Sequence, residues 1–138
     1  MKSKLRVVFD TNIYISAIIF GGNPRTCLEL AKNGKIEVYT SREILFELSQ
    51  KLKKKFAWND YEVADVIQGL SKFVKIVKPK EKIFVIAKDP TDNKILECTK
   101  EAGTDFIVSG DVKHILILKQ FERTKIVKAE EFLKKFYK

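Results

Sequence analysis

The order of strand-like and helix-like segments predicts an α/β fold, a three-layer α/β/α arrangement with helices on both faces of a parallel sheet. Short apolar runs rich in Val, Ile and Phe alternate with longer segments whose apolar residues recur at helical spacing. At 138 residues the chain has the length of one domain, and no repeat, low-complexity stretch or linker divides residues 1–138. A single domain is therefore expected.

Five short apolar segments are expected to form the sheet. Polar or turn residues bound each of them, as they bound the buried strands of parallel sheets. They cover residues 5–9, 36–39, 74–77, 105–108 and 124–127. The first and fourth segments are apolar, which is typical of central strands, and the crossovers between parallel strands should be right-handed.

Capping residues indicate where several helices begin and end. Asn23 precedes Pro24, a favoured first helical residue, and is expected to be a cap. Residues 40–43 and 59–62 both resemble capping boxes, and Gly103 is expected to end a later helix. After residues 40–43 comes a helical stripe of apolar side chains: Ile44, Leu45, Leu48 and Leu52.

The remaining segments are assigned by their apolar pattern. Residues 11–20 are expected to form a buried helix, residues 113–118 a short helix and residues 129–136 a closing helix. Residues 89–92 should begin the helix before the fourth strand, and residues 83–87 should be either a short extended run or part of a loop. Strands and helices therefore alternate from start to end.

The chain is basic, with 27 Lys and Arg residues against 18 Asp and Glu residues, a net charge of +9. Such a charge attracts polyanions and favours a nucleic-acid partner, but lysine-rich surfaces also promote solubility and ion-pair networks, so charge alone leaves the partner open. No apolar run of about 18 residues is present, and no membrane span is expected. The N-terminal residues lack a signal peptide's apolar segment, so a cytoplasmic location is expected.

The cysteines and the histidine do not predict a zinc site. Cys27 and Cys98 lie far apart in helix-like apolar patterns and are expected to be reduced, buried thiols. His114, the only histidine, is expected to be a partly buried helix residue. One imidazole and two separated thiols do not make a zinc ligand set.

Two aspartates follow the two strands expected at the centre of the sheet. Asp10 comes after residues 5–9, and Asp111 comes shortly after residues 105–108. In open parallel sheets, ligands bind at the carboxyl ends of the strands. If the two strands are neighbours, we expect these carboxylates to face each other across a few ångströms.

Two further acids are candidates for the same edge. Asp92 begins the helix that leads into the fourth strand, and Glu47 lies at the edge of an apolar stripe on its helix. Each acid also has a purely structural interpretation. Asp10 could cap a helix, and Asp92 could complement a helix dipole. Glu47 could pair with Lys51, and Asp111 could be a turn residue. Independent caps and turns, however, have no reason to converge on one edge of a sheet.

Clustered carboxylates repel one another, so they become protonated or destabilise the fold unless cations balance their charge. Oxygen ligands suit hard divalent cations such as Mg²⁺ or Mn²⁺. The predicted metal ligands, which are also the predicted catalytic residues, are Asp10, Glu47, Asp92 and Asp111.

These acids lie in motifs that resemble those of the PIN domain family. Residues 8–12 (VFDTN) resemble the opening motif, an apolar strand that ends in Asp-Thr-Asn. Residues 89–93 (DPTDN) and 106–111 (FIVSGD) resemble the third and fourth acidic motifs, and Glu47 lies where the family places its second acid. The resemblance covers essentially the whole chain and is closest to VapC-like toxins. It implies a PIN-like, five-stranded parallel sheet in the order 3-2-1-4-5, with the first and fourth strands adjacent.

The resemblance implies a metal-dependent endoribonuclease with products that carry a 5′-phosphate and a 3′-hydroxyl. The four acids would hold one or two Mg²⁺ or Mn²⁺ ions. Asn12 and Ser109 would orient these acids, directly or through water. Ser109 stands where the family usually has threonine, which keeps the hydroxyl. As the toxin of a toxin–antitoxin pair, the protein would be inhibited by a cognate antitoxin protein and would form a homodimer.

Three lysines near these motifs are candidate RNA contacts. Lys113 follows Asp111, where many relatives carry a further aspartate, and Lys51 and Lys54 lie on the helix that carries Glu47. The lysines of that helix are equally well interpreted as a solvated helix end. Single-stranded RNA is the expected substrate, because an acidic pocket reaches an exposed strand more readily than a stacked duplex.

Two other functions stay open. Lys113, in place of an aspartate, is compatible with a weakened site in a domain that binds RNA or protein without cleaving it. A phosphatase or phospho-acceptor of another α/β family would use Asp10 as its nucleophile. Such enzymes commonly need an aspartate two residues later, where this chain has Asn12.

Overall fold

The computed structural model describes residues 4–84 and 92–137 and has the expected α/β fold. Within these residues, one sheet has the strand order β3-β2-β1-β4-β6-β5. The strands are β1 (Arg6–Phe9), β2 (Glu37–Ser41), β3 (Val74–Val77), β4 (Phe106–Val108), β5 (Gln120–Phe121) and β6 (Thr124–Val127). All except β5 run parallel, and they correspond to the five predicted strands in the predicted order.

The structure adds a sixth strand to the five that the sequence predicts. This strand, β5, is two residues long and pairs antiparallel with β6 at the edge of the sheet. A tight turn joins the two strands, and Glu122 adopts a left-handed conformation in it, with φ of 53°. Two residues are too few to show strand periodicity, so the prediction of five strands was wrong at this edge.

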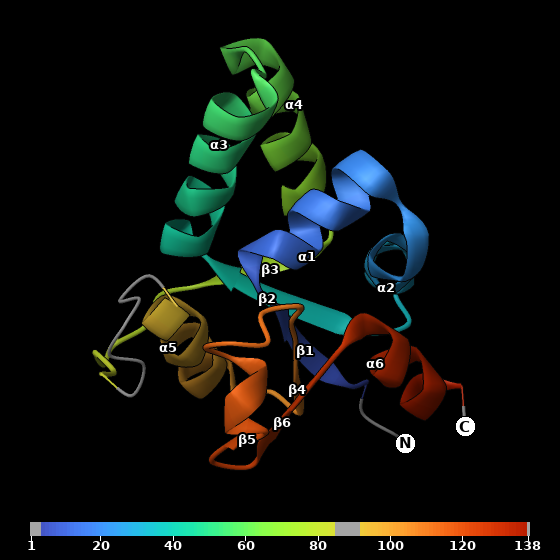
Figure 1. Ribbon diagram of the computed structural model, residues 1–138, viewed down its shortest axis with the longest axis vertical. Helices are drawn as coiled ribbons and strands as arrows, with labels where there is room; N and C mark the ends of the chain where they lie inside the picture. Colours follow the sequence, from blue (N-terminus) through green and yellow to red (C-terminus); the bar gives the residue numbers. More distant parts are fainter. Residues whose placement is uncertain (1–3, 85–91, 138) are drawn as a thin grey trace.

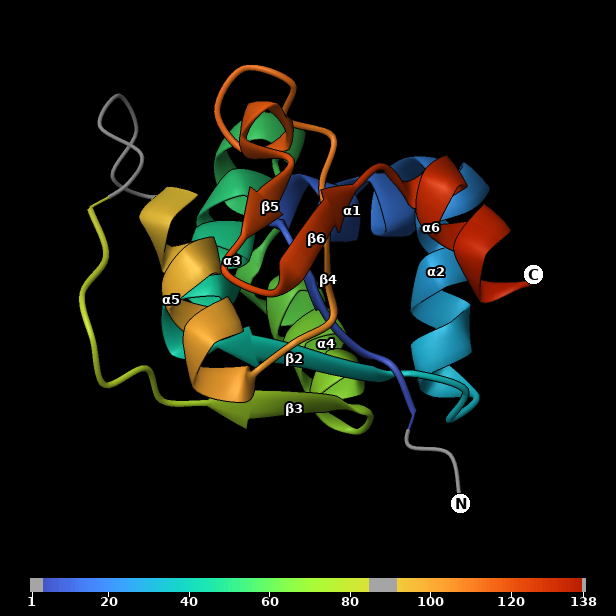
Figure 2. The same ribbon diagram turned by 90° about the horizontal axis from the view of Figure 1, so that it is seen from below.

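Helices lie on both faces of the sheet. Figure 1 shows α3 and α4 on one side of the sheet and α5 on the other, which confirms the three layers. Figure 2 shows α2 beside α6, which it contacts. The helices are α1 (Thr11–Ile15), α2 (Gly22–Lys32), α3 (Arg42–Phe56), α4 (Asp60–Ser71), α5 (Asn93–Ala102) and α6 (Ala129–Phe136). A π-helical segment, Ser16–Phe20, continues α1, and a 3-10 helix, Leu116–Leu118, precedes β5.

Two helix starts differ from the prediction. Ser41 caps α3 by accepting a hydrogen bond from the backbone N–H of Ile44, so residues 40–43 are not a capping box. Asn23 is not a cap, because α2 begins before it and Gly21 is the residue that precedes the helix. Gly21 has a φ of 88°, a conformation that glycine adopts readily and that lets the chain turn directly from the π-helical segment into α2.

Other predicted boundaries agree with the structure. Asn59 and Glu62 form the predicted capping box of α4, and Gly103 ends α5 in a left-handed conformation. Of the helix predicted at residues 113–118, only the last three residues are helical, in the 3-10 form. The extended run predicted at residues 83–87 and the helix start predicted at 89–92 lie largely outside the described residues, which exclude 85–91.

The core holds the carboxyl ends of β1 and β4 side by side. The side chains from Val7 to Phe9 are fully buried, and Tyr14 of α1 packs edge-on against Phe9 with 5.6 Å between ring centroids. Just beyond the paired strands, the Asp10 N–H donates a hydrogen bond to the Val108 carbonyl at 3.0 Å. The residues that follow these two strands are therefore brought together.

Predicted core positions are buried. The apolar stripe of α3 faces the core, and its members are Ile44, Leu45, Leu48 and Leu52. Cys27 and Cys98 are free thiols with no exposed surface, as predicted. Among the described residues, no helix has both the length and the apolar character needed to cross a membrane.

Candidate active site

Asp10 is a buried carboxylate at the carboxyl end of β1. It is 3% exposed, and its Oδ1 accepts a hydrogen bond from the backbone N–H of Ile13 at 2.9 Å. Asp10 is therefore the N-cap of α1, as its structural interpretation requires. Its other oxygen, Oδ2, accepts a hydrogen bond from the hydroxyl of Ser109, the residue that follows the neighbouring strand β4. Capping thus uses one oxygen, and the second connects Asp10 to the residues that follow β4.

Ser109 links the two aspartates that follow neighbouring strands. Its hydroxyl donates to Asp10 and accepts a hydrogen bond from the backbone N–H of Asp111 at 3.0 Å. Asp111 Oδ1 accepts hydrogen bonds from the backbone N–H groups of Lys113 at 3.1 Å and His114 at 3.0 Å. These bonds form a tight turn, and this is why residues 113–115 are not the helix that the sequence predicts.

His114 lies between the carboxylates of Asp92 and Asp111. Its Nδ1 is 3.5 Å from Asp92 Oδ2 and 3.4 Å from Asp111 Oδ2. One ligand atom from each residue lies within 4.8 Å of the other two, a spacing that one metal ion could bridge. Asp92 comes from the start of α5, and His114 comes from the turn after β4.

The sequence prediction missed the position of His114. His114 is partly buried as predicted, but it belongs to a turn and not to a helix. The available signal was Gly110 before Asp111, because aspartate side chains in turns commonly bond the backbone two or three residues later. Such a turn places the residue three positions after the aspartate, here His114, beside the aspartate's side chain.

Glu47 and Lys51 of α3 contribute to the site from another direction. Lys51 Nζ lies 3.8 Å from Glu47 Oε2 and donates a hydrogen bond to Asn12 Oδ1 at 3.2 Å. The i, i+4 pair of Glu47 and Lys51 is therefore present, and their side chains are only 22% and 27% exposed. Lys51 supplies a positive charge among the acids, so a metal ion is not the sole source of counter-charge.

A small cavity joins these side chains. Its lining residues are Asp10, Thr11, Asn12, Glu47, Lys51, Asp92, Ile95 and Asp111. Its volume is about 10 Å³, roughly the space of one water-sized sphere. Within the described residues, the buried hydroxyl of Thr11 has no hydrogen-bond partner. Carboxylates and an unpartnered hydroxyl are oxygen donors, and the lining therefore fits a hard divalent cation.

The environment of Asp10 opposes its negative charge. Burial raises the pKa of Asp10 to about 6, and the charge of Asp111 adds to the rise. The hydrogen bonds from Ser109 and Ile13, and the charge of Lys51, lower the pKa. A carboxylate held in this way gains stability from a nearby cation, because a cation favours the ionised form.

The predicted site residues have different surroundings. All four predicted acids line the cavity. Asn12 also lines it and contacts Lys51, while Ser109 contacts Asp10 and Asp111. Of the candidate RNA contacts, Lys51 lines the cavity. Lys54, further along α3, and Lys113, in the turn after Asp111, are both exposed.

The sequence family described as the PIN domain matches residues 6–113. The chain belongs to the PIN domain family. The matched range contains the four acids of the cavity and ends just before His114, and it confirms the resemblance that the motifs indicate. The uncharacterized protein MJ1680 of Methanocaldococcus jannaschii is 32% identical over an alignment of 151 positions. The alignment covers 99% of this chain and 95% of that protein.

Two solved structures resemble this PIN domain in fold. PAE2754 from Pyrobaculum aerophilum has a TM-score of 0.60 and 13% identity, with 97% of this chain and 90% of that chain covered. The RRP44 PIN domain of T. brucei has a TM-score of 0.54 and 10% identity, with 96% and 81% covered. At these identities the likeness concerns the fold alone.

Proposed function

We propose that this PIN domain is a metal-dependent endoribonuclease that hydrolyses RNA phosphodiester bonds and spans residues 1–138 as one nuclease domain. The observation that carries the proposal is the shared cavity. Its four acids come from the end of β1, from α3, from the start of α5 and from the turn after β4, and they are Asp10, Glu47, Asp92 and Asp111. Caps and turns by themselves do not require this convergence.

The acids would hold one or two Mg²⁺ or Mn²⁺ ions. A bound ion of this kind lowers the pKa of its water, supplies hydroxide near neutral pH and stabilises charge on the phosphate. Asp92, Asp111 and His114 would share one ion. Imidazole nitrogen suits Mn²⁺ better than Mg²⁺, so His114 would favour Mn²⁺ at that position.

The remaining residues of the site would position the ligands. Ser109 holds Asp10 and Asp111 in a defined relation, and Lys51 holds Asn12 and Glu47. Partners of metal ligands commonly contribute tenfold to a hundredfold to metal affinity or activity, on the order of 1–3 kcal/mol. The proposed products carry a 5′-phosphate and a 3′-hydroxyl, and the proposed substrate is single-stranded RNA.

The same proposal includes a biological role, the toxin of a VapC-like toxin–antitoxin pair. Its support is the order and spacing of the acidic motifs. A cognate antitoxin protein, a homodimer and a cytoplasmic location belong to this role and stay predictions. A short neighbouring reading frame that encodes a DNA-binding antitoxin would support it, and rescue of growth by that protein would test it directly.

Cleavage of end-labelled single-stranded RNA with Mg²⁺ or Mn²⁺ tests the enzymatic proposal. Asp10→Asn should strongly reduce the cleavage that the wild-type protein shows, and chelation of the metal should abolish it. Asp65→Asn is the matched control, because Asp65 is an exposed aspartate of α4 that does not line the cavity. Equal cleavage by the wild-type and Asp10→Asn proteins would contradict the proposal.

A weakened PIN domain that binds RNA or protein without cleaving it is the second candidate. Two observations favour it: Lys113 stands where the family resemblance implies a further acid, and Lys51 already balances part of the charge among the acids. Absence of cleavage with either metal, together with RNA binding that Asp10→Asn retains, would establish this alternative.

A further inference from the structure

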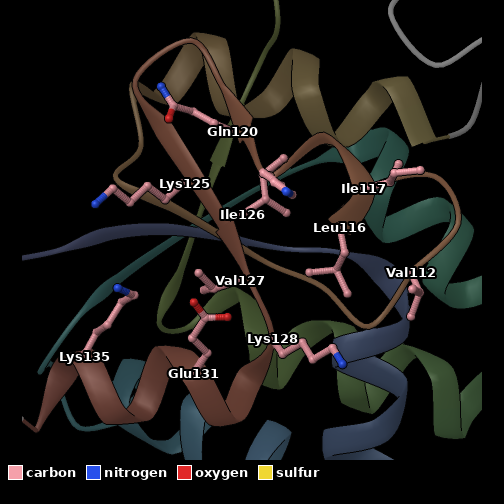
Figure 3. A pocket seen from close by; sticks show the side chains of 11 residues that line it. Val112, Leu116, Ile117, Gln120, Lys125, Ile126, Val127, Lys128, Glu131 and Lys135 are labelled. Carbon is pink, nitrogen blue, oxygen red and sulfur yellow. The ribbon is translucent and has the colours of Figure 1, made fainter.

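A groove of about 640 Å³ lies between the 3-10 helix, β6 and α6 (Figure 3). Its apolar lining comes from Leu116, Ile117, Ile126 and Val127, together with Val112 in the turn after Asp111. Val112 and Ile117 are 63% and 66% exposed. Exposed apolar side chains that line one groove indicate a surface that contacts another molecule.

Positive charge surrounds this apolar lining. The groove is lined by four exposed lysines, Lys119, Lys125, Lys128 and Lys135, and by one acid, Glu131. Figure 3 shows Lys125, Lys128 and Lys135 spread along β6 and α6 and not gathered at one point.

The four groove lysines, like most lysines that the structure describes, are not in ion pairs. Lys53, Lys75, Lys100 and Lys134, by contrast, each lie within 4.0 Å of a carboxylate oxygen: 2.8 Å, 3.2 Å, 2.8 Å and 3.4 Å. The charge of the groove is therefore available to an anionic partner.

One end of the groove adjoins the candidate active site. The Ser109 N–H donates to the Val127 carbonyl at 3.0 Å, and the Ser109 hydroxyl donates to Asp10. Lys128 is the next residue after Val127, so it lies at the same edge of the sheet. From there β6 leads away to Lys125, about 10 Å for three residues of strand.

We propose that this groove binds single-stranded RNA and holds the part of the strand that extends from the cleavage site. This inference rests on the proposed function, and it says along which surface the RNA lies next to the cleavage site. Phosphates would pair with the lysines, and unstacked bases would pack on the apolar lining. A duplex hides its bases in the stack and has no apolar surface to offer, so the lining favours a single strand.

An acidic peptide with apolar side chains is the other occupant that this surface chemistry suits. Proximity to the acidic cavity favours RNA, because Val112 of the groove directly follows Asp111 of the cavity, and a strand cleaved at the cavity extends beyond it. A peptide partner has no such requirement.

Fluorescence anisotropy of a labelled single-stranded RNA tests the proposal in full-length protein that carries Asp10→Asn, so that binding is measured without cleavage. Lys125→Glu with Lys135→Glu should weaken binding by at least about tenfold. It should also reduce the slope of log affinity against log salt by about 1.4, from two phosphate contacts at about 0.7 each. Lys32→Glu with Lys72→Glu is the matched control, because these lysines line a separate groove of about 580 Å³ formed by α2 and α4.

Each outcome separates the groove from the nuclease proposal. Equal RNA binding by the two double variants overturns the groove assignment even if the wild-type protein cleaves RNA. A loss of RNA binding in the groove variant alone supports the groove assignment even if the wild-type protein does not cleave RNA.

A labelled peptide that alternates glutamate and leucine is the second probe. If the protein binds this peptide and not RNA, and the groove variant loses the peptide, the RNA assignment is overturned. If the groove variant does not fold, crosslinking of 4-thiouridine RNA to Asp10→Asn protein decides, and crosslinks that avoid residues 112–135 count against the proposal.

Discussion

The candidate site has two halves that the fold holds in different ways. Asp10 and Ser109 lie at the ends of adjacent strands, are 3% and 0% exposed, and are hydrogen-bonded to each other. The side chains of Glu47, Asp92 and His114 come from helices and a turn and are 16–29% exposed. The strand half is part of the core, and the other half lies against solvent. We infer that the first sets the geometry of the site and that the second adjusts it.

The largest expected effect is the loss of cleavage when Asp10, the acid at the end of β1, is replaced. Asp10→Asn should lower kcat on the order of 10³-fold, and Glu47→Gln by about tenfold to a hundredfold. The difference follows from the orientation of Asp10, which hydrogen bonds from Ile13 and Ser109 fix, while Glu47 is held by a longer ion pair with Lys51 at 3.8 Å. Single-turnover cleavage measures both. A larger loss in Glu47→Gln would reverse the assignment of the two halves.

The second expected effect concerns stability. The pKa of Asp10 is raised to about 6 in the folded protein from 3.8, so the folded protein binds the proton more tightly than the unfolded chain. In metal-free protein, the free energy of unfolding should therefore fall as pH rises from about 4 to about 6. Asp10→Asn removes this titration and should be more stable than the wild type by up to about 3 kcal/mol above pH 6.

Urea unfolding in a chelator at pH 4 and pH 7 measures this difference. The gain of Asp10→Asn should be present at pH 7 and nearly absent at pH 4. Added Mn²⁺ should stabilise the wild type at pH 7 and stabilise the variant less, because the variant lacks a ligand charge. The same gain at both pH values would show that burial of the Asp10 charge is not its cause.

The third expected effect isolates the hydroxyl between the two strand-end aspartates. Ser109→Ala removes the donor to Asp10 and the acceptor for the Asp111 N–H. Activity should fall by roughly tenfold to a hundredfold, and Ser109→Thr should restore most of it because the hydroxyl returns. An inactive Ser109→Thr protein with a normal melting temperature would show that more than the hydroxyl is required.

The smallest expected effect is on the choice of metal. His114→Ala should weaken Mn²⁺ binding by about tenfold and Mg²⁺ binding by less, since imidazole is the better ligand for Mn²⁺. Titration calorimetry measures both affinities without reference to cleavage. Lys113→Ala is the neighbouring control, because its side chain is exposed and its backbone bond to Asp111 is kept. Equal losses for both ions would remove His114 from the ligand set.

Local sequence patterns predicted most of the fold. The parallel strands, the stripe of α3 and the capping box of α4 each depend on residues close together in the chain. Two of the failures share a cause. The hairpin of β5 and the Gly21 helix start depend on single residues with positive φ, and periodicity does not record a backbone conformation.

The sequence by itself determined that Asp10 and Asp111 follow apolar strands, because strand ends are read from neighbouring residues. Only the tertiary structure decided the rest of the arrangement: His114 between two carboxylates, Lys51 among the acids, and four lysines around one groove. These relations join residues from different elements. They exist because chain packing, and not local pattern, sets the direction in which each side chain points.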